Sequence, residues 1–258
     1  MEYCFFKINR NKKSQITIFI ILALIIVVLI LLVFVGLRPP IVISHDEKSP
    51  QIFIESCTKE ILEKTLDKIR LHGGVVDPEL NVLYGGEKRT YLCYTNKDYN
   101  KCVNQKPKLI ESIEEEITLD ITNDINRCFE TLKLNLEKSY EIDMSGMKIK
   151  SELKPKEVVI TINRGFKMTK GDDVREFDMF KIGMIDPMYE LALVSMEIVN
   201  QEAQYCNFDN LGYMIIYPEY DISRIKTGDS DTIYRVGDRM TKKDFNFAVR
   251  SCVLPAGI

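Results

Sequence analysis

The feature that most constrains this chain is an uncharged stretch, residues 16–37, in which Thr17 is the only polar side chain. As an α-helix it would extend about 33 Å at 1.5 Å per residue, enough to cross the hydrocarbon core of a bilayer. A secretory signal peptide has a shorter apolar region that ends in small residues, whereas this stretch ends in Gly36, Leu37 and Arg38. A buried core helix needs only an apolar stripe. The stretch therefore predicts a retained transmembrane helix over residues 16–37.

Charge gives the predicted helix an orientation. Residues 1–15 hold four basic side chains and one acid, Glu2, and since the whole chain has a net charge of −3, the remainder carries −6. Basic residues beside a span mark its cytoplasmic side. We therefore expect a plasma-membrane protein with a cytoplasmic basic head (1–15) and with residues 38–258 extracytoplasmic, so that the lipid bilayer is its first partner. An acidic domain argues against nucleic-acid binding.

The cysteines agree with that orientation. Cys4 lies in the basic head, and six more follow the apolar stretch: Cys57, Cys93, Cys102, Cys128, Cys206 and Cys252. An even number in an oxidising space predicts disulfides. The competing interpretation, a zinc site, requires closely spaced Cys pairs with nearby His, and even the closest two here, Cys93 and Cys102, are too far apart. We therefore expect disulfides and no metal ligand.

After a tether over residues 38–50, the first part of the outer domain (51–140) predicts a helical pair. Apolar residues recur every three or four positions from about 51 to 72, where Gly73-Gly74 ends the helix, and again over 108–139. Such a stripe also suits a coiled coil; we favour a domain core, because the first helix needs a partner. Cys57 and Cys128 lie on the two apolar faces, so we expect a bridge that stabilises by about 4 kcal/mol under the chain-entropy model. Between the helices, Cys93 and Cys102 suit a local disulfide loop.

The second part (141–258) changes to alternating patterns typical of strands. Residues 147–153 and 157–168 predict a hairpin around Lys154-Pro155-Lys156, and Asp186-Pro187 predicts the start of a helix to about residue 204. Strands are expected at 213–217, 232–236 and 244–252, and a Cys206–Cys252 bridge would tie down the chain end. The order ββαβββ after a helical pair predicts an α+β fold: a mainly antiparallel sheet with one packed helix.

Candidate chemistry is sparse. His72 lies near a helix end, where it interacts favourably with the helix dipole; Glu114, Glu115 and Glu116 fan over about 200° of a helix and cannot converge on one ion. We therefore predict a solvated face there, and no catalytic residue, metal or cofactor. Four tyrosines surround the local disulfide loop and are either a contact surface or strand packing: Tyr84, Tyr91, Tyr94 and Tyr99.

The segment Lys12-Lys13-Ser14-Gln15-Ile16-Thr17-Ile18-Phe19 resembles the class III signal segment of archaeal type IV pilins. The resemblance implies cleavage between Ser14 and Gln15, although Phe19 stands where those pilins usually carry Glu. More of the chain resembles uncharacterised single-span proteins of small-genome archaea. The shared segments are residues 15–24, 55–74, 107–128 and 245–250. This resemblance implies an archaeal surface protein and brings no activity with it.

Three functions follow as hypotheses. The first is a membrane-anchored extracytoplasmic structural or interaction protein with a protein partner or self-association. The second is a type IV pilin-like filament subunit processed after Ser14. The third, a surface enzyme, is the weakest, because no nucleophile–base pair or metal cluster stands out in the sequence.

Overall fold

The computed structural model describes residues 22–27 and 49–253. Residues 22–27 are helical with exposed side chains. The rest of the predicted span lies outside the described residues, as do the basic head, the Ser14–Gln15 junction and nearly all of the tether. No helix within the described ranges is long and apolar enough to cross a membrane. Residues 1–48 and 49–258 are two separate units, and the second holds both sheets.

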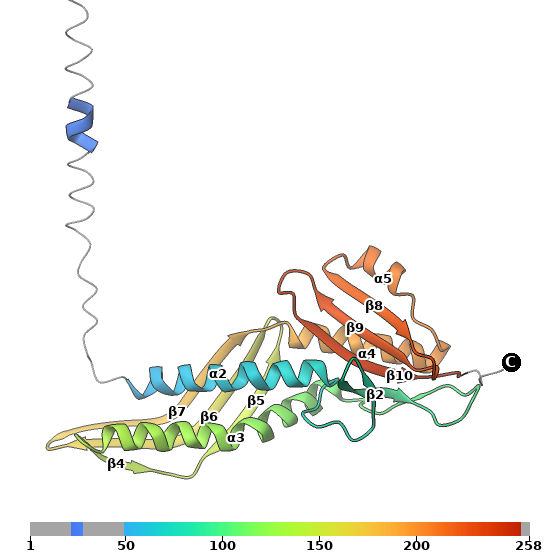
Figure 1. Ribbon diagram of the computed structural model, residues 1–258. Helices are drawn as coiled ribbons and strands as arrows, with labels where there is room; N and C mark the ends of the chain where they lie inside the picture. Colours follow the sequence, from blue (N-terminus) through green and yellow to red (C-terminus); the bar gives the residue numbers. More distant parts are fainter. Residues whose placement is uncertain (1–21, 28–48, 254–258) are drawn as a thin grey trace, which may run out of the picture. The chain divides into compact units, whose positions relative to one another are not determined.

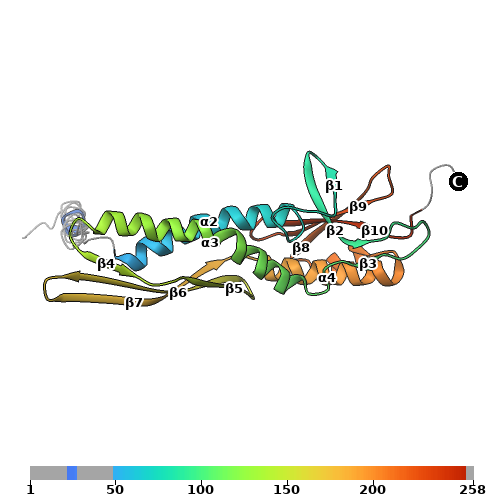
Figure 2. The same cartoon turned by 90° about the horizontal axis from the view of Figure 1, so that it is seen from below.

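Two long helices form the predicted pair. They are α2 (Pro50–Leu71) and α3 (Leu109–Leu136), and they lie side by side in both views (Figures 1 and 2). Their apolar stripes face inward, so that Leu66 and Ile121, for example, are fully buried. Gly73 and Gly74 follow α2 with φ values of +72° and +98°, a conformation that glycine adopts at little steric cost.

A four-stranded antiparallel sheet covers part of this pair. Its strands are β4 (Glu141–Met144), β5 (Lys148–Lys154), β6 (Glu157–Lys170) and β7 (Asp173–Ile185). β4 and β5 pair with successive parts of β6, while β7 pairs along its whole length. Alternate residues of β6 are fully buried, among them Val158, Ile160 and Ile162. The hairpin predicted at Lys154-Pro155-Lys156 is confirmed, but β4 and β7 were absent from the sequence prediction.

The second sheet joins segments that are far apart in the chain. Its strands are β1 (Asn81–Tyr84), β2 (Glu87–Tyr94), β3 (Val103–Asn104), β8 (Tyr220–Lys226), β9 (Thr232–Asp238) and β10 (Asp244–Arg250). The order is β1-β2-β10-β9-β8, with β3 beside β2; β2 and β10 run parallel and the other pairs antiparallel. β2 comes from the predicted helical part (51–140) and β10 from the predicted second part (141–258). Because these two strands pair, the two parts share one sheet.

The remaining helices are α4 (Met188–Tyr205) and α5 (Asn210–Ile216). α4 is the helix predicted after Asp186-Pro187, and it packs on the second sheet, where Tyr234, Phe245 and Phe247 are fully buried. The α+β class with mainly antiparallel sheets is therefore confirmed. The order after residue 140 is ββββααβββ instead of ββαβββ.

The strand predicted at 213–217 was wrong, because most of this segment belongs to α5. The side chain of Asp209 accepts a hydrogen bond from the Gly212 N–H at 3.0 Å and so caps the helix. Asn210 Nδ2 donates to the Ile222 carbonyl, and the Ile222 N–H donates to Met214 Sδ. α5 thereby covers the free edge of β8, an arrangement that protects a strand from pairing with other chains.

Candidate functional site

Three of the four predicted tyrosines gather on the outer face of the second sheet. Tyr84, Tyr91 and Tyr94 pack with Val82, Ile233 and Ala248 in a small apolar cluster separate from the main core. The rings of Tyr91 and Tyr94 lie 4.9 Å apart and tilted, a favourable aromatic geometry. Tyr99 is 56% exposed in the loop after β2 and is not part of this cluster.

The two interpretations of these tyrosines apply to different residues. Tyr91 is only 7% exposed, so it packs against the strands and offers little contact surface. Burial, together with the nearby carboxylate of Asp231, raises the pKa of Tyr91 and keeps its phenol protonated. Tyr84 and Tyr94 are half-buried and Tyr99 is exposed, and for these three the contact surface remains a prediction.

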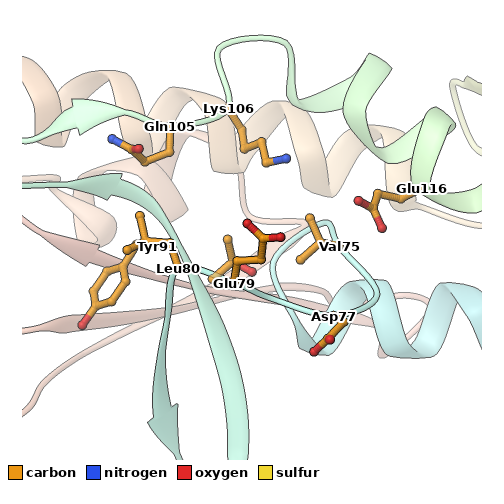
Figure 3. A pocket seen from close by; sticks show the side chains of 9 residues that line it. Val75, Asp77, Glu79, Leu80, Tyr91, Gln105, Lys106 and Glu116 are labelled. Carbon is orange, nitrogen blue, oxygen red and sulfur yellow. The ribbon is translucent and has the colours of Figure 1, made fainter.

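A cleft of about 360 Å³ opens beside Tyr91 (Figure 3). Its walls come from the loop after α2, from β2, from the segment before α3 and from α3 itself. They consist of Val75, Asp77, Glu79, Leu80, Thr90, Tyr91, Gln105, Lys106 and Glu116. Lys106 and Glu116 extend toward the cleft, whereas the ring of Tyr91 points away from it.

Several of these polar groups already have partners. Asp77 pairs with Lys88 at 2.9 Å, and this ammonium lowers the pKa of the Asp77 carboxyl. Glu116 Oε2 accepts from the Val76 N–H at 3.1 Å, and Lys106 Nζ donates to Ser112 Oγ. The cleft has three carboxylates and one ammonium, and Lys88 neutralises Asp77 from outside the cleft. The remaining excess of about one negative charge favours a partner group that is cationic.

The acidic run on α3 differs from its prediction. Glu115 is exposed, as expected of a solvated face, but Glu114 and Glu116 accept backbone hydrogen bonds from Leu153 and Val76 respectively. The two carboxylates thereby tie α3 to β5 and to the loop after α2. Within the part of the chain that the structure describes, no group of three His, Cys, Asp or Glu side chains could hold a metal ion.

His72 lies at the end of α2, as expected. Its Nδ1 is 2.8 Å from the Val76 carbonyl, and its Nε2 is 3.5 Å from a carboxylate oxygen of Glu87. These contacts hold the loop that lines the cleft.

The structure reveals a buried ionic junction that the sequence prediction missed. Asp186 is 1% exposed and pairs with Arg70 of α2 at 2.9 Å and with Lys243 at 2.7 Å. Its other oxygen accepts from the N–H of Met188, the first residue of α4, although Pro187 and not Asp186 is the N-cap residue. The only sequence signal was Asp186-Pro187 as a helix start, which identified the beginning of α4 to within one residue but neither cation.

A second polar group lies at the other end of α4. Glu202 is 2% exposed, accepts a hydrogen bond from the hydroxyl of Tyr234, and lies 3.7 Å from Arg224. Burial, and next the charge of Glu202, raise the pKa of Tyr234, so the phenol remains a donor. This group borders a pocket of about 160 Å³ that Cys206 and Cys252 also line.

All six cysteines of the described fold are paired as predicted. The disulfides are Cys57–Cys128, Cys93–Cys102 and Cys206–Cys252, with Cα–Cα distances of 6.3, 5.4 and 5.8 Å. Comparison with protein-family models, with curated proteins and with solved structures finds no match for this chain.

Proposed function

We propose that this chain is a single-pass membrane protein whose disulfide-bonded domain acts outside the cell as a structural or interaction module. The observation that carries the proposal is the pairing of every cysteine after the uncharged stretch. Disulfides persist in oxidising compartments and are rare in the cytosol. Cys4, the one cysteine before the stretch, lies among the basic residues that the positive-inside rule assigns to the cytoplasm.

The outer face of the second sheet supports interaction as the task. Tyr84 and Tyr94 are partly accessible there, and tyrosine is enriched where proteins bind one another. The adjoining cleft offers the carboxylate of Glu79 beside those of Asp77 and Glu116, which also contact Lys88 and the Val76 N–H. A protein partner that places a Lys or Arg side chain in this cleft fits both features.

Protease accessibility tests the topology. The full chain would be expressed with one epitope tag before Met1 or one after Ile258, and intact cells would be treated with proteinase K. We expect loss of the C-terminal tag and retention of the N-terminal tag, with both lost after detergent lysis. Retention of the C-terminal tag until lysis would contradict the proposal.

A second candidate, a pilin-like filament subunit, is favoured by the segment Lys12–Phe19. The intact mass of protein purified from membranes separates the two candidates. A chain that lacks residues 1–14 would support the pilin, and a chain that retains its basic head would support the anchor. Ser14→Trp is the matched variant, because a bulky side chain at the cleavage position blocks processing but leaves an anchor unchanged.

A further inference from the structure

The Cys206–Cys252 disulfide differs from the other two in its surroundings. Cys206 is the residue that ends α4, and Cys252 follows the last strand. Both are half-buried and both line the 160 Å³ pocket. By contrast, Cys93 is 0%, Cys102 4% and Cys128 3% exposed. Cys57 is half-buried as well, but its partner Cys128 is buried. Cys206–Cys252 is therefore the one described disulfide in which both cysteines are half-buried and open to a small thiol.

The backbone at this disulfide is strained. Cys206 and Cys252 both have left-handed conformations, with φ values of +56° and +46°. Such a conformation costs a non-glycine residue on the order of 1 kcal/mol or more. Cys57 and Cys128 instead lie within regular helices, and Cys93 lies within a strand. The Cys206–Cys252 bond thus joins two left-handed residues, whereas both residues of the helix-to-helix bridge have regular helical conformations.

The charge in the pocket favours a thiolate. Arg224 and Lys226 line it together with the two cysteines, and Glu202 is its one carboxylate. The Nε of Arg224 is buried, and within the described residues it has no hydrogen-bond partner. Nearby cations stabilise the thiolate that leaves when a disulfide is attacked, which speeds exchange.

We propose that Cys206–Cys252 is a site of thiol–disulfide exchange with a dithiol. A thiolate of the dithiol attacks one sulfur, the S–S bond breaks, and its electron pair stays on the other cysteine as a thiolate that takes up a proton. The second thiol of the dithiol then loses its proton and attacks the dithiol's own sulfur in the mixed disulfide. The bond to the protein sulfur breaks, and that cysteine leaves as a thiolate and takes up a proton. The dithiol is oxidised to a cyclic disulfide, and the two electrons that it gives up reduce Cys206 and Cys252 to thiols.

Exchange would release the chain end from α4. The disulfide closes a loop of 46 residues that contains α5 and strands β8 to β10. The Cys252 N–H also donates to the Asn100 carbonyl at 2.7 Å, so the loop after β2 is coupled to the same point. Reduction would loosen the segment that follows β10 and the end of α4, and would leave the α2–α3 pair closed.

Graded reduction tests the proposal. The oxidised full chain in detergent micelles would be exposed to a series of dithiothreitol concentrations, quenched with N-ethylmaleimide and mapped by peptide mass spectrometry. We expect Cys206 and Cys252 to be labelled at least tenfold faster than the other four cysteines. Earlier labelling of another pair, or simultaneous labelling of all three, would overturn it. The assay is independent of membrane topology, so its outcome and that of the protease test are separate.

A charge variant sharpens the test. Lys226→Gln removes one cation from the pocket and should slow labelling of Cys206 and Cys252 about threefold. Lys138→Gln, an exposed position after α3, is the matched control and should leave every rate unchanged. Urea midpoints within error of the parent chain would show that both variants are folded. An unchanged labelling rate in Lys226→Gln would contradict the role of charge.

Discussion

The two ends of the domain use a disulfide in different ways. At the helix pair, Cys57 and Cys128 lie on helical faces that already pack together through buried isoleucine and leucine side chains. At the end of α4, Cys206 and Cys252 hold two left-handed residues beside a polar pocket. The first disulfide adds to packing that exists without it, whereas the second lies beside the polar side chains of Glu202 and Arg224. This difference predicts a stable bridge at one end and a labile one at the other.

Removing each disulfide in turn should show the largest difference in stability between the two ends of the domain. Cys57→Ala with Cys128→Ala should lower the free energy of unfolding by about 4 kcal/mol, because a long loop is released in the unfolded chain. Cys206→Ala with Cys252→Ala should cost only about 2 kcal/mol, since relief of the strained backbone offsets part of the loop term. Urea denaturation of the full chain in micelles measures both. Equal losses, or a larger loss at the second pair, would contradict the distinction.

The ionic junction between the two ends provides the next test. Asp186→Asn should destabilise by about 3 kcal/mol, because it removes the buried carboxylate between Arg70 and Lys243 and leaves Arg70 only its exposed partner Asp67. Asp173→Asn is the matched control: its ion pair with Arg175 is about half exposed, so a loss below about 0.5 kcal/mol is expected. The urea midpoints of the two variants decide the matter, and similar losses would refute a special role for burial.

A smaller effect should come from the buried tyrosine at the end of α4. Tyr234→Phe removes the hydroxyl that donates to Glu202, and a buried acceptor that loses its donor costs about 1 to 2 kcal/mol. Tyr205→Phe, at a position 65% exposed, should change nothing measurable. The expected loss is accompanied by faster labelling of Cys206 and Cys252 in dithiothreitol. If labelling stays at the parent rate, this hydrogen bond does not stabilise the C-terminal end.

The smallest expected effect is a fall in the stability of the domain at alkaline pH. Burial, and next the charge of Glu219, raise the pKa of Tyr220 to about 12, above the unfolded value of about 10. The unfolded chain therefore loses this proton first, so stability falls as pH rises from about 10 to 12. Tyr220→Phe should reduce that fall in the urea midpoint. Neither α2 nor α3 contains tyrosine, so a fall that is unchanged in Tyr220→Phe would refute its assignment to this residue.

The sequence predicted best where a single periodic pattern decides the structure. The stripes of α2 and α3 fixed which face of each helix is buried, and hence that Cys57 and Cys128 meet. Prediction failed where a partner distant in the chain decides. Residues 213–217 are rich in strand-forming side chains, yet most of them belong to a helix that Asp209 caps. This helix hydrogen-bonds to the edge of β8 through Asn210. The alternation of β7 is obscured by Asp173, Arg175 and Glu176 on an exposed strand.

The candidate sites likewise divide into those that a local pattern predicts and those that depend on contacts between distant segments. Disulfide partners could be chosen because each cysteine lies on a predictable face or at an element end. The cleft beside Tyr91 could not be foreseen, since it joins the loop after α2, β2 and α3. The partners of Asp186 lie 116 and 57 residues away, so only the three-dimensional fold reveals them.

We propose that every cysteine after the uncharged stretch is oxidised in the native protein, because disulfides persist in the oxidising space outside the cell. The most direct test is to alkylate intact cells and lysates with N-ethylmaleimide before any reductant is added, and then to measure the mass of the purified chain. We predict at most one adduct, on Cys4, and six further adducts only after reduction and denaturation. Adducts on Cys57, Cys128 or the other paired cysteines before reduction would contradict the claim.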